Sequence, residues 1–232
     1  PYRERCAGCS HLGRSAEEEA SHKNRLLKSA FEKIGVTLGD IQYLRAPEQG
    51  FRNRIDLQIR GSKLTDQKVQ RVGLFGFEKG SKGSPEVINI DACAMLEPDL
   101  NDLLKEIQKL KFNIKKGSLR LRTYKKNRGI WLDFSNEDIK SLFEEARAIY
   151  PSSSLLSELS KLGVVEVGQR RKRLTKDFKL TDPILEEWSE TYLPCSADLD
   201  DIAAIPLNSS IASFSQPGSQ SNFQLIHETL RL

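Results

Sequence analysis

The sequence predicts an α+β fold in which an antiparallel sheet is accompanied by helices. Short segments with alternating apolar and polar residues, separated by turn residues, are typical of paired strands. Other segments repeat apolar residues every three or four positions, which indicates helices with one buried face. Strands joined by hairpins and accompanied by helices give the α+β class.

The first helix is predicted to begin at Ser15 and to end at Gly35. Ser15 and Glu18 have the spacing of a capping box, in which each side chain accepts a hydrogen bond from the other residue's backbone N–H. The acidic run 17–19 lies at the positive end of the helix dipole, and glycine commonly ends a helix. The residues expected on its apolar side are Ala20, Leu27, Phe31 and Ile34.

From Phe51 the apolar period changes to two, which predicts a strand with one apolar face and one cation-rich face. Residues 71–78, "RVGLFGFE", follow as its partner strand, and "KGSKGS" is a turn by composition. Residues 85–93, "PEVINIDAC", form the next expected strand. The sequence therefore places Cys93 at the end of a strand.

The middle of the chain is expected to add helices and a hairpin. Pro98 lies in the first turn of a helix with a leucine-rich face, and residues 118–135 are predicted to form a hairpin with the turn "KKNRG". Another helix is expected after Ser135, and a shorter one ends at Gly163 before the candidate strand "VVEVGQ". These elements continue the antiparallel sheet and its helices.

The last quarter of the chain has weaker patterns. "TDPILEEW" at 181–188 is expected to begin a short helix, and residues 197–204 form an acidic connector. A final helix is expected within 219–232, where Ser221 and Gln224 have capping-box spacing.

Composition limits the kind of protein. The 232 residues suit one or two domains, and 38% hydrophobic with 29% charged residues is typical of a globular protein. No apolar run approaches the roughly 20 residues of a membrane span, so no membrane partner is expected. Four cysteines do not make a disulfide scaffold, which favours the reducing cytoplasm. We expect a monomer.

Positive charge is clustered more than the net charge of +4 suggests. Seven basic residues and no acid lie between Lys115 and Arg128, and a second cluster covers 170–176. Like charges gathered in this way repel one another and favour a nearby polyanion. The alternative is a solvated face without a partner.

Three of the four cysteines form a candidate metal site. Cys6 and Cys9 have the C-x-x-C spacing that lets two thiolates reach one metal, and Cys93 is the candidate third ligand. Both zinc and an iron–sulfur cluster take about four ligands; His11 would suit zinc, whereas a cluster favours cysteine. Buried free thiols are the alternative. Cys195 is interpreted as a structural thiol, because no base stands at a recognisable spacing from it.

Several segments together resemble one family of enzymes. They are "CAGCSHLGRS" with "HKNRLLKSAFEKIG", then "GFRNRIDLQI", then "VGLFGFEKGSKGSPEVINIDACAMLEPDLNDLL", and finally "IASFSQPGSQSN". In this order they resemble the cluster-bearing RNA uracil-5-methyltransferases, which use S-adenosylmethionine to make 5-methyluridine in ribosomal and transfer RNA. The resemblance is good over residues 1–110 and 205–225.

The resemblance implies a [4Fe–4S] cluster on Cys6, Cys9, Cys93 and a further cysteine. The family pattern places that further cysteine immediately before Pro1, so the chain is expected to be a fragment. The family's glycine-rich loop for S-adenosylmethionine, its nucleophilic cysteine and its glutamate base would follow Leu232. No catalytic residue is therefore expected in this chain, which alone should be inactive.

The resemblance also assigns residues that bind cofactor and RNA. Gln216 matches the family glutamine beside cofactor and substrate, although Gly218 stands where the family usually has asparagine. An amide can both donate to and accept from the edge of a uracil. Aromatic residues and basic side chains suit unpaired bases and phosphates. The RNA-binding candidates are Phe51, Arg52, Arg54, Arg120, Arg122, Lys125, Lys126 and Arg128.

The implied organisation has four parts. Residues 1–14 form a cysteine cluster loop, 15–36 a helix packing toward the methyltransferase domain, 37–200 a central α+β RNA-binding domain, and 201–232 the start of an α/β methyltransferase domain. The expected function is methyl transfer from S-adenosylmethionine to C5 of a uridine in ribosomal or transfer RNA. The alternative is a non-catalytic RNA-binding module with a structural metal site.

Overall fold

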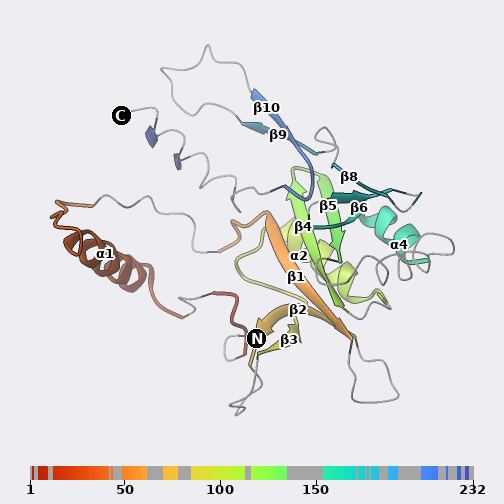
Figure 1. Ribbon diagram of the computed structural model, residues 1–232. Helices are drawn as coiled ribbons and strands as arrows, with labels where there is room; N and C mark the ends of the chain where they lie inside the picture. Colours follow the sequence, from red (N-terminus) through yellow and green to blue (C-terminus); the bar gives the residue numbers. More distant parts are fainter. Residues whose placement is uncertain are drawn as a thin grey trace.

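The computed structural model is a mixed α and β chain built around one large sheet (Figure 1). It describes residues 2, 5–9, 13–41, 43, 49–61, 70–77, 85–112, 116–134, 154–170, 172–175, 177, 179–182, 188–192, 205–213, 218, 224–225 and 228–229.

The large sheet has eight strands in the order β3-β2-β1-β4-β5-β6-β7-β8. Every described pair of neighbours is antiparallel except β5 and β6, which are parallel and are connected through a helix. Two further strands, β9 and β10, pair separately. The bounds are β1 Arg54–Gly61, β2 Gln70–Gly76, β3 Glu86–Asn89, β4 Lys116–Tyr124, β5 Asn127–Asp133, β6 Val164–Gln169, β7 Lys172–Leu174, β8 Leu180–Thr181, β9 Trp188–Tyr192 and β10 Ile205–Ser209.

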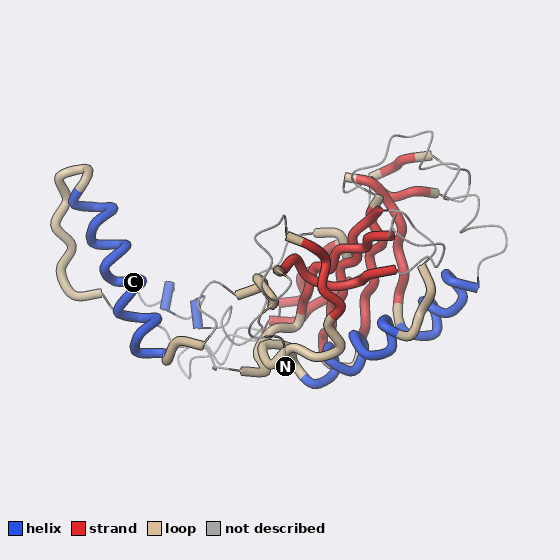
Figure 2. The backbone as a smooth tube through the Cα atoms, turned by 90° about the horizontal axis from the view of Figure 1, so that it is seen from below, coloured by secondary structure: helices blue, strands red, loops and turns tan. Residues whose placement is uncertain are grey.

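One face of the sheet carries the main hydrophobic core. Helices α2 (Pro98–Gln108) and α4 (Ser154–Leu162) lie along this face (Figure 2). The strands contribute every second residue to the core, such as Leu57 and Ile59 of β1, which are fully buried. The helices contribute apolar residues at helical spacing, which α2 does with Leu100, Leu103, Leu104 and Ile107. The predicted strand, hairpin and leucine-rich helix are confirmed.

Helix α1 (Ala16–Glu32) confirms its predicted start but not a buried face. Ser15 and Glu18 form both hydrogen bonds of the capping box. No residue of α1 is buried, and the helix stands apart from the sheet in both views (Figures 1 and 2). On its expected apolar side, Leu27 is 40% exposed. The described residues therefore leave that side uncovered.

The second face of the sheet is polar, and a distant segment covers part of it. Residues 209–213, here called the strap, cross β4 and β5. Ile211 and Ala212 of the strap form a small apolar cluster with Trp131 of β5. Arg122 lies beneath the strap with 2% of its surface exposed, and its Nη1 donates to the carbonyl of Ser210 at 3.1 Å. The cation-rich face is thus partly an interior surface.

Of the expected helix at 181–188, Thr181 belongs to β8 and Trp188 to β9, and residues 183–187 lie outside the described residues. The predicted helix after Ser135, the connector 197–204 and the cap at Ser221 lie outside the described residues. Among the residues that are described, no helix combines the length and apolarity needed to cross a membrane.

Replacing Arg122 with methionine tests how far the strap depends on the buried guanidinium. Methionine keeps much of the side-chain length but cannot donate to the Ser210 carbonyl, so we expect the free energy of unfolding to fall by about 1–3 kcal/mol. Urea denaturation measures this change. Lys126→Met, at an exposed turn, is the matched control and should change the free energy by less than about 0.5 kcal/mol. Equal effects of the two variants would show that the guanidinium does not hold the strap.

Candidate functional site

The segment that carries Cys6 and Cys9 is attached to the end of β2. Cys6 pairs with Gly76 in an isolated antiparallel bridge, beyond the residues of β2 that pair with β1. The backbone N–H of Ala7 donates to the Phe75 carbonyl at 3.1 Å, and that of Phe77 donates to the Arg5 carbonyl at 2.9 Å. The C-x-x-C segment therefore extends the sheet locally.

Cys93 approaches the same region from the next strand. It follows β3, which pairs with β2 over residues that include Phe75 and Gly76. Cys6, Cys9 and Cys93 are free thiols and are each partly exposed. Sequence reasoning expected these cysteines to converge, and the topology brings their segments to the same two strands.

The Cys9 thiol is influenced electrostatically by the other two cysteines of the candidate site. Burial raises the pKa of the Cys9 thiol; the Arg52 guanidinium opposes this, while negative charge on Cys93 and Cys6 raises that pKa further. Within the described parts of the chain, however, no three His, Cys, Asp or Glu side chains are grouped as a metal site. The thiols are thus close enough to interact but are not arranged as ligands.

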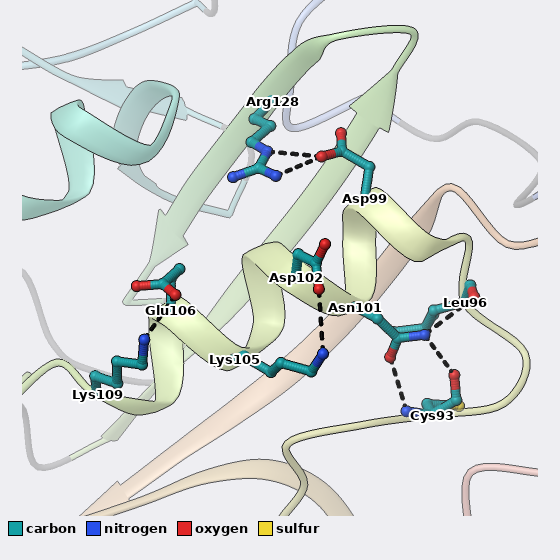
Figure 3. A network of polar contacts seen from close by, with 9 residues as sticks. All are labelled: Cys93, Leu96, Asp99, Asn101, Asp102, Lys105, Glu106, Lys109 and Arg128. Carbon is teal, nitrogen blue, oxygen red and sulfur yellow. Dashed lines mark hydrogen bonds and ion pairs between the residues drawn. The ribbon is translucent and has the colours of Figure 1, made fainter.

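Asn101 holds the backbone of Cys93 in place (Figure 3). Its Oδ1 accepts from the Cys93 N–H at 2.9 Å, and its Nδ2 donates to the carbonyls of Cys93 and Leu96 at 3.0 and 3.1 Å. Asn101 lies near the start of α2, whose N-cap residue Glu97 makes no side-chain cap. Sequence reasoning missed this residue, although an asparagine in the first turn after a cysteine loop is a usable signal.

Phe51 and Arg52 lie beside the Cys93 loop. The N–H groups of Phe51 and Arg52 donate to the Met95 carbonyl at 3.1 and 2.8 Å, and Arg52 forms a parallel bridge with Leu96. The Arg52 guanidinium lies 5.9 Å from the centroid of the Phe51 ring. Of the RNA-binding candidates, these two are the ones next to the thiols.

Three arginines expected at the RNA surface are used inside the molecule. Arg54 and Arg122 are buried, and Arg120 donates from Nε to Asp56 at 2.5 Å and from Nη1 to carbonyls of the strap. Burial raises the pKa of the Asp56 carboxyl, but hydrogen bonds and charges from Arg120 and Arg54 outweigh this and lower it. The expectation that Arg54 and Arg122 are surface cations is therefore wrong, because the strap covers Arg122 and Asp56 forms an ion pair with Arg54.

The remaining candidates lie at the β4–β5 turn and on the helix-covered face. Lys125 and Lys126 are exposed in the turn, and the Lys125 ammonium lies 5.4 Å from the centroid of the Tyr124 ring. Arg128 instead donates from Nε to Asp99 of α2 at 3.1 Å (Figure 3). Arg128 is thus engaged with the first turn of a helix that packs on the core face. Gln216 and Cys195 lie outside the described residues.

Comparisons with known proteins identify relatives of this chain. No family model matches it. An uncharacterised RNA methyltransferase of Bdellovibrio bacteriovorus is 31% identical over 227 residues, which is 96% of this chain and 52% of that protein. The 23S rRNA (uracil(1939)-C(5))-methyltransferase RlmD of Chromohalobacter salexigens is 31% identical over 107 residues, 46% of this chain and 21% of the relative. The chain thus spans about half the length of the Bdellovibrio relative.

A solved structure shares the fold. The tRNA (uracil-54, C5)-methyltransferase of Pyrococcus abyssi, crystallised with S-adenosyl-L-homocysteine, superposes with a TM-score of 0.54 at 15% identity. The match covers 98% of this chain and 51% of that protein. At this level of identity the match shows a common arrangement of helices and strands.

Replacing Asn101 with alanine tests whether its hydrogen bonds to Cys93 and Leu96, here called the Asn101 clasp, hold the Cys93 loop. The variant loses three hydrogen bonds, so we expect the free energy of unfolding to fall by about 1–3 kcal/mol and the Cys93 thiol to react faster with iodoacetamide. Mass spectrometry of alkylated peptides measures the rate at Cys93. Asp102→Ala, exposed on the same helix, is the control and should leave that rate unchanged. An unaltered rate in Asn101→Ala would contradict the clasp.

Proposed function

The chain is related to the RNA uracil-C5 methyltransferases, and we propose that it holds RNA in an enzyme that methylates C5 of a uridine in ribosomal or transfer RNA. The observation that carries this proposal is the relationship to an RNA methyltransferase over 96% of the chain.

The chemistry explains what such a chain must do. Uracil C5 is a poor nucleophile, and in the proposed reaction a cysteine thiolate adds to C6 and so makes C5 reactive. S-adenosylmethionine would supply the methyl group to C5, after which a base would remove the C5 proton and the thiolate would leave C6. We assign none of these covalent steps to the residues of this chain. Its part is to hold the RNA so that the target nucleotide can leave its stack, because a stacked base hides C5.

We propose that Gln216 is the residue of this chain that lies nearest to the reacting base. The amide of glutamine has both a donor and an acceptor, which matches the N–H and carbonyl groups on the edge of a neutral pyrimidine. The strap leads toward Gln216 in the sequence and is fixed to β4 by Arg120 and Arg122. We therefore propose that Gln216 contributes to the site for uridine and S-adenosylmethionine.

We also propose that Cys6, Cys9 and Cys93 hold a [4Fe–4S] cluster. Thiols are the donors that such a cluster takes, and the pKa of Cys9 responds to charge on the other two. The residues fit the cluster in the chemical type of their donor atoms, and they would supply three of its four ligands. A bound cluster would tie the C-x-x-C segment to the loop after β3. All three cysteines are free thiols, which suits a reducing cytoplasm.

Metal reconstitution tests the assignment of the three thiols. After anaerobic treatment with iron and sulfide, we expect broad absorption that bleaches on reduction, and we expect Cys9→Ser and Cys93→Ser each to lose most of the bound iron. Iron analysis and absorption spectroscopy measure these changes. Cys195→Ser, which removes the thiol interpreted as structural, is the control and should keep its iron. A colourless protein that takes up zinc alone would favour the non-catalytic RNA-binding module.

The modification itself can be tested in cells. Deleting the gene that encodes this chain should remove one 5-methyluridine from ribosomal or transfer RNA, as measured by nucleoside mass spectrometry. The wild-type gene and a Cys195→Ser gene should both restore it, whereas Gln216→Ala should restore less. An unchanged 5-methyluridine content in every RNA after deletion would refute the proposed activity.

A further inference from the structure

The polar face of the sheet is divided into two halves along β1 and β4. In one half, Arg54 faces Arg122 and Asp56 faces Arg120, and the strap lies over these residues. In the other half, the register places Arg60 opposite Lys116, away from the strap contacts described above. Three of the seven basic residues expected to meet RNA lie in the covered half, and Arg128 is engaged on the opposite face. The half around Arg60, here called the open half, is therefore the better candidate surface of the sheet.

A row of three cations crosses the open half. Arg60 of β1 is the register partner of Arg71 in β2 on one side and of Lys116 in β4 on the other. Directly opposed like charges raise the free energy of a sheet, and a polyanion laid across them lowers it. Glu86 pairs with Arg71 at the outer end of the row. The row therefore has the charge and direction to follow a phosphate backbone across three strands.

Two exposed aromatic rings stand next to this cation row. Phe75 and Phe77 are 43% and 46% exposed, and Phe75 lies on the same face of β2 as Arg71, because Val72 and Leu74 face the core. Phe77 follows two residues later. The pair forms an apolar surface on a face that is otherwise mostly polar.

The ring of Phe75 is held in a defined relation to Arg60. The Arg60 guanidinium lies 5.8 Å from the ring centroid, and it donates to the Ile59 carbonyl at 2.8 Å, to Gln58 Oε1 at 3.2 Å and to the Gly117 carbonyl at 3.3 Å. These bonds fix the cation before any ligand arrives. Fixed cations beside exposed rings are the elements with which proteins hold single-stranded nucleic acid.

We propose that Phe75 and Phe77, with the row Arg71, Arg60 and Lys116, form a stacking platform for single-stranded RNA. The inference rests on the proposed function and names the surface that holds the RNA. Bases stack on the rings and phosphates follow the cations, which accounts for both features of the surface. Backbone bonds from Ala7 and Phe77 to the neighbouring backbone place the platform beside the C-x-x-C segment. RNA on the platform therefore passes close to Cys6.

The test is the affinity of the 232-residue chain for a fluorescein-labelled single-stranded oligouridylate, measured by anisotropy at several salt concentrations. Phe75→Ala and Phe77→Ala should each weaken binding about tenfold, because each removes one stacked base, and they should leave the salt dependence unchanged. Arg60→Gln and Lys116→Gln should instead flatten the dependence of log affinity on log salt by about 0.7 for each phosphate that the variant no longer neutralises.

Two matched variants separate stacking from other roles of the ring. Phe75→Trp should keep the affinity, whereas Phe75→Leu should lose it, because leucine is apolar but cannot stack on a base. Leu26→Ala, which trims an exposed apolar residue of α1, is the control and should bind like the wild type. Phe75, Phe77 and Leu26 are exposed, whereas Arg60 and Lys116 are partly exposed, and circular dichroism checks that all the variants are folded.

The outcomes distinguish the platform from the wider function. If the wild type binds RNA with a steep salt dependence but Phe75→Ala binds equally well, the platform is refuted and RNA binding stands. If Phe75→Leu keeps full affinity, the ring covers an apolar partner rather than a base, and the platform is again refuted. If the wild type does not bind RNA at low salt, the proposed role in holding RNA fails as well.

Discussion

The buried guanidinium of Arg122 is the interaction on which the arrangement of the polar face depends. A charge removed from water is costly unless its donors are used, and here Nη1 donates to the Ser210 carbonyl beneath the strap. Arg120 adds bonds to the strap and to Asp56. A planar guanidinium can donate in several directions at once, which an ammonium on a flexible stem does less well. Two arginines of one strand thus fix a segment that is distant in the sequence.

The position of the strap decides which part of the polar face is covered. The strap covers the half of the polar face on which Asp56 and Arg122 lie, and its described contacts do not extend to the half around Arg60 and Phe75. The strap also sets the point from which the chain continues toward Gln216. One set of bonds therefore bears on where the proposed RNA platform lies on the sheet and on where the segment leading to Gln216 begins.

The sequence could predict the elements but not the environment of the cations. Alternation and helical spacing located β1 and the buried face of α2, because burying an apolar side chain imposes a period that the sequence records. The sequence of a hairpin does not reveal the surroundings of its basic residues. Lys126, in the turn, faces solvent, whereas Arg122, in β4, donates to a carbonyl of a distant segment. The convergence of the cysteine segments was predictable from spacing and resemblance, whereas the Asn101 clasp depends on a loop conformation that no local period encodes.

The thiols and the proposed platform share one piece of backbone, so their states are coupled. Bonds between residues 5–7 and 75–77 join the C-x-x-C segment to the strand end that carries both rings. A group that orders Cys6 and Cys9 removes conformational freedom from that strand end before RNA arrives, and less entropy is then lost on binding. Linkage makes the effect reciprocal, because RNA that orders the rings stabilises the thiol segment by the same free energy. On this argument a cluster bound at the thiols would change the affinity for RNA without contacting it.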